Sequence, residues 1–109
     1  MSIDAMKTAA ENGDARAQSA LGYAYDIGEG VTQSLETAAY WYRQAAEQGY
    51  ANAQFNLAEM IRDGAGVTQS NEVALEWYTK AAMQGHSKAQ YNVAMMHVQG
   101  EGITADNVT

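Results

Sequence analysis

The sequence predicts an all-α solenoid of stacked helix–turn–helix repeats, and three observations support this fold class. Short motifs recur along the 109-residue chain with a constant period of 36 residues. Within each unit, the apolar residues follow the spacing of one helix face. Proline is absent and alanine is abundant, and both features favour helices.

Four short motifs return at this interval, which identifies the chain as a repeat array. They are a lone glycine, an Ala-Gln pair, a Gly-x-Gly turn and a Trp-Tyr pair. The glycines are Gly13, Gly49 and Gly85; the Ala-Gln pairs are Ala17-Gln18, Ala53-Gln54 and Ala89-Gln90; the turns begin at Gly28, Gly64 and Gly100; and the Trp-Tyr pairs are Trp41-Tyr42 and Trp77-Tyr78.

Each repeat begins with a helix that we name the A-type helix. Its apolar residues stand at positions i, i+3, i+4, i+7 and i+8 or close to them, which lie together on one face of a helix. This stripe predicts A-type helices over about residues 15–27, 51–62 and 87–98. It consists of Ala17, Ala20, Leu21, Ala24 and Tyr25 in the first repeat, of Ala53, Leu57, Met60 and Ile61 in the second, and of Ala89, Val93, Met96 and His97 in the third.

The second helix of each repeat, the B-type helix, carries a stripe of alanines around the Trp-Tyr pair. It predicts helices over about residues 35–48 and 71–84. A further B-type helix is expected near residues 3–12, where Ala5-Met6 stands in place of Trp-Tyr. We expect Trp41 and Trp77 to fill the space between A-type and B-type helices, where small residues let the backbones approach closely.

The predicted helix ends carry suitable capping residues. Ser34 and Ser70 precede the B-type helices and Asp14 precedes the first A-type helix, and all three are good N-caps. The lone glycines follow the B-type helices, where a residue with positive φ often ends a helix. The chain is therefore predicted to be one array, with a partial repeat at 1–13, repeats at 14–49 and 50–85, and a partial repeat at 86–109.

The composition argues against several classes of function. The net charge is −7 and the sequence contains no basic block, so binding to nucleic acid is not expected. The chain has no cysteine, which excludes thiolate catalysis, disulfides and cysteine-ligated zinc. No stretch approaches the roughly 18 apolar residues of a membrane span, so we expect no membrane insertion.

The N-terminus lacks the basic and apolar segments of a signal peptide, but the sequence does not fix the cellular compartment. The chain as it stands predicts a soluble, cytoplasmic protein. It would be periplasmic or secreted if a signal peptide had been removed. The segment Asn107-Val108-Thr109 fits a glycosylation sequon, for which we expect no role.

No motif predicts a catalytic residue, a metal ligand or a cofactor. The Gly-x-Gly turns recur between two helices in every repeat, whereas phosphate-binding glycine loops follow a strand. His86 and His97 have no cysteine partner and no His-Glu-x-x-His motif, so we expect packing or surface roles for both. The acidic residues are scattered, mostly on faces predicted to be exposed.

The combined pattern resembles the Sel-1-like repeat, a relative of the tetratricopeptide repeat. The first repeat carries it at Ala17-Gln18, Leu21-Gly22, Tyr25, Gly28, Gly30-Val31, Ala38, Trp41-Tyr42, Ala45-Ala46 and Gly49. Gly22 becomes Ala58 and Ala94 in the later repeats, which is a modest departure. The resemblance implies a right-handed α/α superhelix that serves as a protein-interaction scaffold, a type common in bacterial signalling, secretion and envelope systems.

By analogy with tetratricopeptide repeats, the A-type helices line an inner groove in which a partner would bind. Residues that differ between repeats mark this surface, because packing positions stay constant. Rigid aromatic residues such as Phe55 and Tyr91, interspersed with polar donors, suit a peptide-binding surface. The predicted groove residues are Arg16, Ser19, Tyr23, Asp26, Asn52, Phe55, Glu59, Arg62, Lys88, Tyr91 and Met95.

The C-terminal end of the array is unusually apolar, although a terminal repeat normally has a polar outer face. Met83, Met95, Met96 and Val98 form this end, and no B-type helix follows them. Two explanations compete. Either the chain was cut from a longer array, or this surface docks against a partner, which includes self-association with a second copy.

The sequence therefore predicts a non-enzymatic scaffold that binds a peptide or protein partner in its groove. One alternative is an inhibitor or immunity-type protein that blocks an effector enzyme with the same surface, and another is a purely structural or oligomerisation role. A third alternative is an envelope enzyme, because some members of the broader family are linked to hydrolysis of cell-wall antibiotics. Those relatives are rich in periodic cysteine, and this chain has none.

Overall fold

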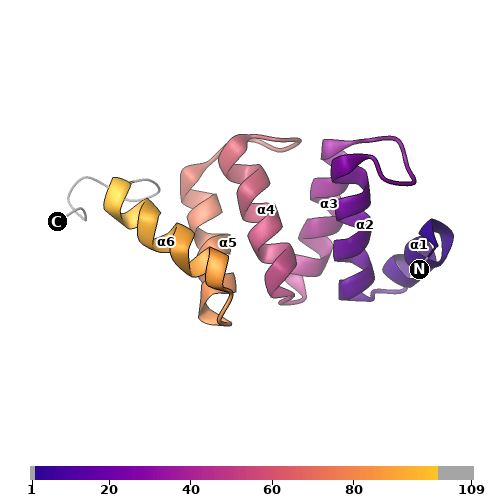
Figure 1. Ribbon diagram of the computed structural model, residues 1–109, viewed down its shortest axis with the longest axis horizontal. Helices are drawn as coiled ribbons and strands as arrows, with labels where there is room; N and C mark the ends of the chain where they lie inside the picture. The colour runs from indigo at the N-terminus through magenta and orange to yellow at the C-terminus, as the bar shows by residue number, and fades with distance from the viewer. Residues whose placement is uncertain (1, 101–109) are drawn as a thin grey trace.

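The protein is an elongated stack of α-helices, described by a computed structural model over residues 2–100 (Figure 1). Its Cα atoms extend over 50 × 25 × 17 Å. The described residues form six helices and no strand, which confirms the all-α prediction. The helices are α1 (Ile3–Glu11), α2 (Ala15–Ile27), α3 (Leu35–Glu47), α4 (Ala51–Asp63), α5 (Asn71–Met83) and α6 (Ser87–Gln99), each within one residue of its predicted ends.

Packing in this stack is local, as a solenoid requires. Each helix packs mainly on the one before it and the one after it along the chain. The A-type helices α2, α4 and α6 lie nearer the viewer in Figure 1 than the B-type helices α3 and α5. Because a single hairpin cannot bury both of its faces, stacking is what completes the core.

The predicted helix caps are present. The Ser34 and Ser70 hydroxyls accept hydrogen bonds from the backbone N–H groups of Thr37 and Val73. The Asp14 carboxylate accepts from the N–H of Ala17 in the same way. The three glycines that follow the B-type helices have φ between 92° and 93°, so they end those helices in the region that glycine tolerates best.

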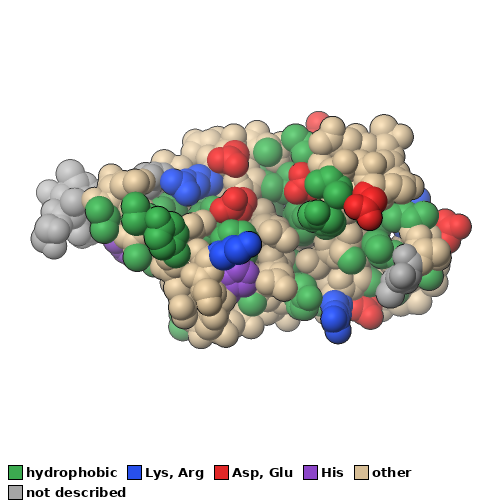
Figure 2. Space-filling view, viewed as in Figure 1, with side chains coloured by type: hydrophobic (Ala, Val, Ile, Leu, Met, Phe, Trp, Pro, Cys, Tyr) green, Lys and Arg blue, Asp and Glu red, His purple; other side chains and the backbone are tan. Residues whose placement is uncertain are grey.

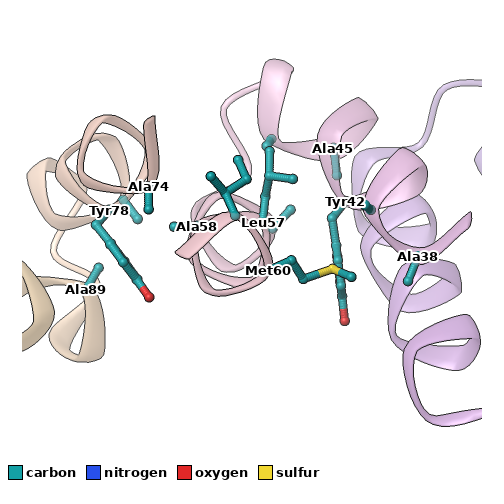
Figure 3. Close-up of a cluster of buried hydrophobic side chains, with 14 of the residues drawn as sticks. Ala38, Tyr42, Ala45, Leu57, Ala58, Met60, Ala74, Tyr78 and Ala89 are labelled. Atoms are coloured by element: carbon teal, nitrogen blue, oxygen red, sulfur yellow. The ribbon is translucent and has the colours of Figure 1, made fainter. Parts of the chain in front are cut away.

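The aromatic core differs from the prediction in one respect. Trp41 and Trp77 are only partly buried, whereas the neighbouring Tyr42 and Tyr78 are buried almost completely. In Figure 3 the two tyrosine rings lie among small side chains such as Ala45, Ala74 and Ala89. In the first repeat, Gly22 on the facing helix α2 makes room for the buried ring of Tyr42, because a Cβ at Gly22 would stand only 2.8 Å from that ring.

Glutamines join one repeat to the next, a role that the sequence patterns did not predict. Gln18 donates to the carbonyl oxygen of Ala10 at 3.0 Å, and Gln54 donates to the equivalent Ala46 at 3.2 Å. Gln48 donates to the side-chain oxygen of Gln18 at 2.9 Å. Gln84 repeats that bond to Gln54 at the same distance. The two bonds to carbonyl oxygens join successive repeats, the two glutamine–glutamine bonds join the two helices of one repeat, and all four satisfy buried polar groups.

Candidate interaction groove

A hollow of about 560 Å³ crosses the face formed by the A-type helices. It extends from α2 across the first half of α4 to the start of α6, so three successive repeats contribute to it. It is lined by Arg16, Ser19, Ala20, Tyr23, Tyr50, Asn52, Phe55, Asn56, His86, Ser87 and Lys88. Six of the eleven predicted groove residues are among these: Arg16, Ser19, Tyr23, Asn52, Phe55 and Lys88.

The aromatic side of the hollow is built around Phe55. Its ring stacks on His86, with 4.7 Å between centroids and 21° between planes. It also packs against the buried Tyr78 with centroids 5.7 Å apart. Phe55 is therefore held by the core and half-buried, so it offers an ordered apolar surface and not a mobile side chain.

The polar side of the hollow consists of exposed side chains. Arg16, Asn52 and Lys88 are all exposed, and Tyr23 exposes 53% of its surface. Ser19 belongs to the hollow but is buried, so little of its side chain is accessible. Figure 2 shows a basic side chain against a histidine near the centre of this face, with acidic side chains mostly above them in that view.

Two important residues of the hollow were missed by the sequence patterns. Tyr50 and His86 occupy the position just before α4 and α6, where Asp14 precedes α2. Nδ1 of His86 accepts from the N–H of Ala89 at 3.1 Å and caps α6, which agrees with a packing role in a turn. This position differs in all three repeats, which is the same signal that identified the other groove residues.

Three other predicted groove residues do not line the hollow and instead interact with the buried tyrosines of the two repeats. Glu59 accepts hydrogen bonds from the Tyr78 hydroxyl at 2.8 Å and from the Asn92 side-chain amide at 3.0 Å. Asp26 accepts from the Tyr42 hydroxyl at 3.5 Å. Arg62 lies close enough to Tyr78 to favour its ionised form. These side chains serve the packing of the B-type helices at least as much as they present a binding surface.

The two buried tyrosines have strongly altered acidity. Burial is the main cause that raises the pKa of Tyr42 above its usual value near 10, and Asp26 adds to the rise. Burial likewise raises the pKa of Tyr78, with Glu59 as the second cause. Both tyrosines are therefore neutral hydrogen-bond donors at physiological pH, as a packing role requires.

The remaining predicted groove residues lie on the last helix, α6. Tyr91 is exposed and Met95 is half-buried, and neither lines the hollow. At the proposed end surface, Met83 exposes 83% and Val98 exposes 73% of its surface. Met96 does not belong to that surface, because its side chain is fully buried in the core between α5 and α6. Met96 belongs to the apolar stripe of its A-type helix, and this explains why its side chain is buried.

Chemistry-bearing groups are sparse in the part of the chain that the structure describes. Within residues 2–100, no three His, Asp or Glu side chains lie close enough together to hold a metal ion. His97 is exposed near the end of α6. None of the described helices is long and apolar enough to cross a membrane. The sequon at Asn107 lies outside the described residues.

The helix-pair repeats and the groove define a repeat protein of the tetratricopeptide-like class. The family model for the Sel1 repeat matches residues 15–50, 51–86 and 87–108. The chain therefore belongs to the Sel1 repeat family, whose members are generally non-catalytic protein-interaction scaffolds. No curated protein matches the chain significantly.

Two solved structures illustrate the family fold. The chain is 41% identical to a protective antigen present in uropathogenic Escherichia coli strains, which displays an SLR fold, with a TM-score of 0.91. It is 34% identical to a Sel1 repeat protein from Oxalobacter formigenes, with a TM-score of 0.89. Each match covers 94% of this chain, but only 22% and 42% of the respective neighbours, so both are considerably longer.

Proposed function

We propose that this protein is a non-catalytic interaction module that binds a segment of a partner protein in the hollow across α2, α4 and α6. The observation that carries the proposal is the hollow itself, in which three repeats bring an ordered aromatic surface and exposed polar donors together. Interfaces bind through such rigid aromatic anchors surrounded by polar groups.

The form of the hollow favours an extended segment over a small molecule. Residues that line it come from three successive A-type helices, so it runs along the stack and is not a closed cavity. An extended peptide exposes its backbone N–H and C=O groups, and Asn52 and Asn56 offer both a donor and an acceptor to such groups. A half-buried apolar side chain of the partner would then lie against Phe55 and His86.

A pair of tyrosines offers a matched test of the groove. Tyr23 lines the hollow and exposes 53% of its surface, whereas Tyr40 lies on the B-type helix α3 and exposes 54%. Both variants, Tyr23→Ala and Tyr40→Ala, would be immobilised beside the wild type and used to capture proteins from the source organism. Retention of helicity by circular dichroism verifies that each variant is folded.

We expect only the groove variant, Tyr23→Ala, to lose affinity for the partner. A partner captured by the wild type and by Tyr40→Ala should bind Tyr23→Ala about tenfold more weakly, as is typical of an aromatic residue in an interface. Cross-links of that partner should fall on α2, α4 or the start of α6. Equal capture by the two variants, or cross-links confined to the B-type helices, would contradict the proposal.

A further inference from the structure

The local charge in the hollow is opposite to that of the whole chain. The sequence contains 13 acidic and 6 basic residues, with a net charge of −7. The described residues that line the hollow nevertheless include Arg16 and Lys88 and no Asp or Glu. The same lining contains His86 and six further side chains with N–H or O–H donors, so hydrogen-bond donors gather in the hollow of an acidic protein.

The basic side chains stand at equivalent positions of the array. Arg16, Asn52 and Lys88 are each the second residue of their helix, in α2, α4 and α6 respectively. All three are exposed. The stacking of repeats therefore places one donor per repeat along the hollow, with positive charges near its two ends and a neutral amide between them.

Two acidic residues near this row in the sequence, Asp14 and Glu59, are engaged in hydrogen bonds. Asp14 caps α2 by accepting from the N–H of Ala17. Glu59 accepts two hydrogen bonds, from Tyr78 and from Asn92. Neither lines the hollow. Within residues 2–100, neither Arg16 nor Lys88 forms an ion pair with a carboxylate, so both charges are available to a ligand.

From this arrangement we infer that the groove recognises an acidic, extended segment of another protein, with carboxylates at Arg16 and Lys88 and an apolar side chain between them. This inference rests on the proposed groove function and specifies its partner. Arginine forms bidentate hydrogen bonds with carboxylates, and lysine attracts them as a compact charge. Asn52 donates to a third carboxylate or to a backbone carbonyl between them.

The overall negative charge limits how large such a partner is. At physiological ionic strength the Debye length is about 8 Å, so distant charges on the array are largely screened. A short acidic segment in contact with Arg16 and Lys88 therefore gains more from the local attraction than it loses to the rest of the chain. A large acidic domain would meet the exposed acidic residues outside the hollow as well.

Three synthetic nonapeptides provide the probes for a test. They share the same tyrosine and leucine residues and carry four Glu, four Gln or four Lys at the remaining variable positions. Titration into the ¹⁵N-labelled full chain gives both the dissociation constant and, from the amide shifts, the binding site. The expected order is Glu tighter than Gln by about tenfold, with the Lys peptide weakest.

A charge-matched pair of variants then isolates the groove. Arg16→Gln/Lys88→Gln and Lys7→Gln/Lys80→Gln both bring the net charge to about −9 by removing two positive charges. Lys7 and Lys80 lie on the B-type helices α1 and α5, away from the hollow. The first variant should weaken the Glu peptide by about two- to thirtyfold, the range of two exposed ion pairs, and the second by less than twofold.

The outcomes separate the inference from the proposed function. Equal affinity of the Glu and Gln peptides, with shifts in the hollow, would overturn the acidic partner and leave the groove function standing. Equal weakening by the two double variants would also overturn it, because overall charge would then explain the preference. Absence of shifts in the hollow with all three peptides at millimolar concentration would overturn both.

Discussion

The first full repeat, α2–α3, and the second, α4–α5, share one framework and differ on the groove face. Both use an N-cap serine before the B-type helix, a buried tyrosine and the same glutamine bonds. On the A-type helices, Ser19 in the first repeat is replaced by Phe55 in the second, and the exposed Tyr23 by Glu59, which is bonded to Tyr78. The shared framework is therefore constant, whereas equivalent positions of the A-type helices take different roles in the two repeats.

The two repeats also differ in how closely their neighbours approach them. Gly30 and Gly66 occupy the same place in the turn between the A-type and B-type helices, with φ of 78° and 74°. A Cβ at Gly66 would stand 2.5 Å from the carbonyl group of Leu35 at the start of α3. A Cβ at Gly30 would stand 3.8 Å from Ile3 at the start of α1. The second turn is thus packed tightly on the preceding repeat.

The largest expected effect is that of Gly66→Ala. It combines the cost of an alanine at positive φ with a collision against backbone atoms, and should lower the free energy of unfolding by about 3 kcal/mol. Gly30→Ala has only the first cost, about 1 kcal/mol. Urea unfolding followed by helical circular dichroism measures both. Equal losses in the two variants would show that the closer approach in the second repeat has no energetic consequence.

The glutamine network should respond equally in both repeats. Gln18→Ala and Gln54→Ala each remove a buried side chain that donates to one partner and accepts from another, at a cost of about 2 kcal/mol. Gln90→Ala serves as the control, because its side chain is exposed and the expected cost is about 0.5 kcal/mol. A difference above about 1 kcal/mol between the two buried sites would contradict the equivalence of the repeat junctions.

Removal of the buried tyrosine hydroxyl should destabilise the second repeat more than the first. Tyr78→Phe removes a 2.8 Å hydrogen bond to the carboxylate of Glu59 and should destabilise the protein by about 1.5 kcal/mol. Tyr42→Phe removes a contact of 3.5 Å to Asp26, at the limit of a hydrogen bond, and should cost about 0.5 kcal/mol or less. Thermal unfolding of the two variants compares them, and the reverse order would refute the distinction.

Alkaline pH should affect the two repeats alike. The pKa of both tyrosines is raised mainly by burial, so the folded state retains protons that the unfolded state loses near pH 10. Their contribution is complete below about pH 10 and declines as the pH rises towards the folded pKa, by about 1 kcal/mol per tyrosine at pH 11. Each Phe variant should remove a similar share of this decline. An unchanged pH profile in Tyr42→Phe/Tyr78→Phe would disprove the assignment.

Local pattern was sufficient for the helices, because their determinants are local. The 36-residue period, the apolar stripes and the caps at Asp14, Ser34 and Ser70 placed every described helix end within one residue. A period of this kind reports which side of each helix is buried, since every repeat must present the same face to its neighbours. It cannot report which residue of a neighbouring pair enters the core.

Contacts between helices decided the rest. The burial of Tyr42 in preference to Trp41 depends on the small residue Gly22 on the facing helix, and the buried position of Met96 depends on α5. The glutamine bonds span 30 residues of sequence, and the hollow gathers side chains from residue 16 to residue 88. Periodicity along one chain specifies faces, but distances between faces arise only when the helices stack, and those distances placed Phe55 on His86 and Arg16 and Lys88 around one hollow.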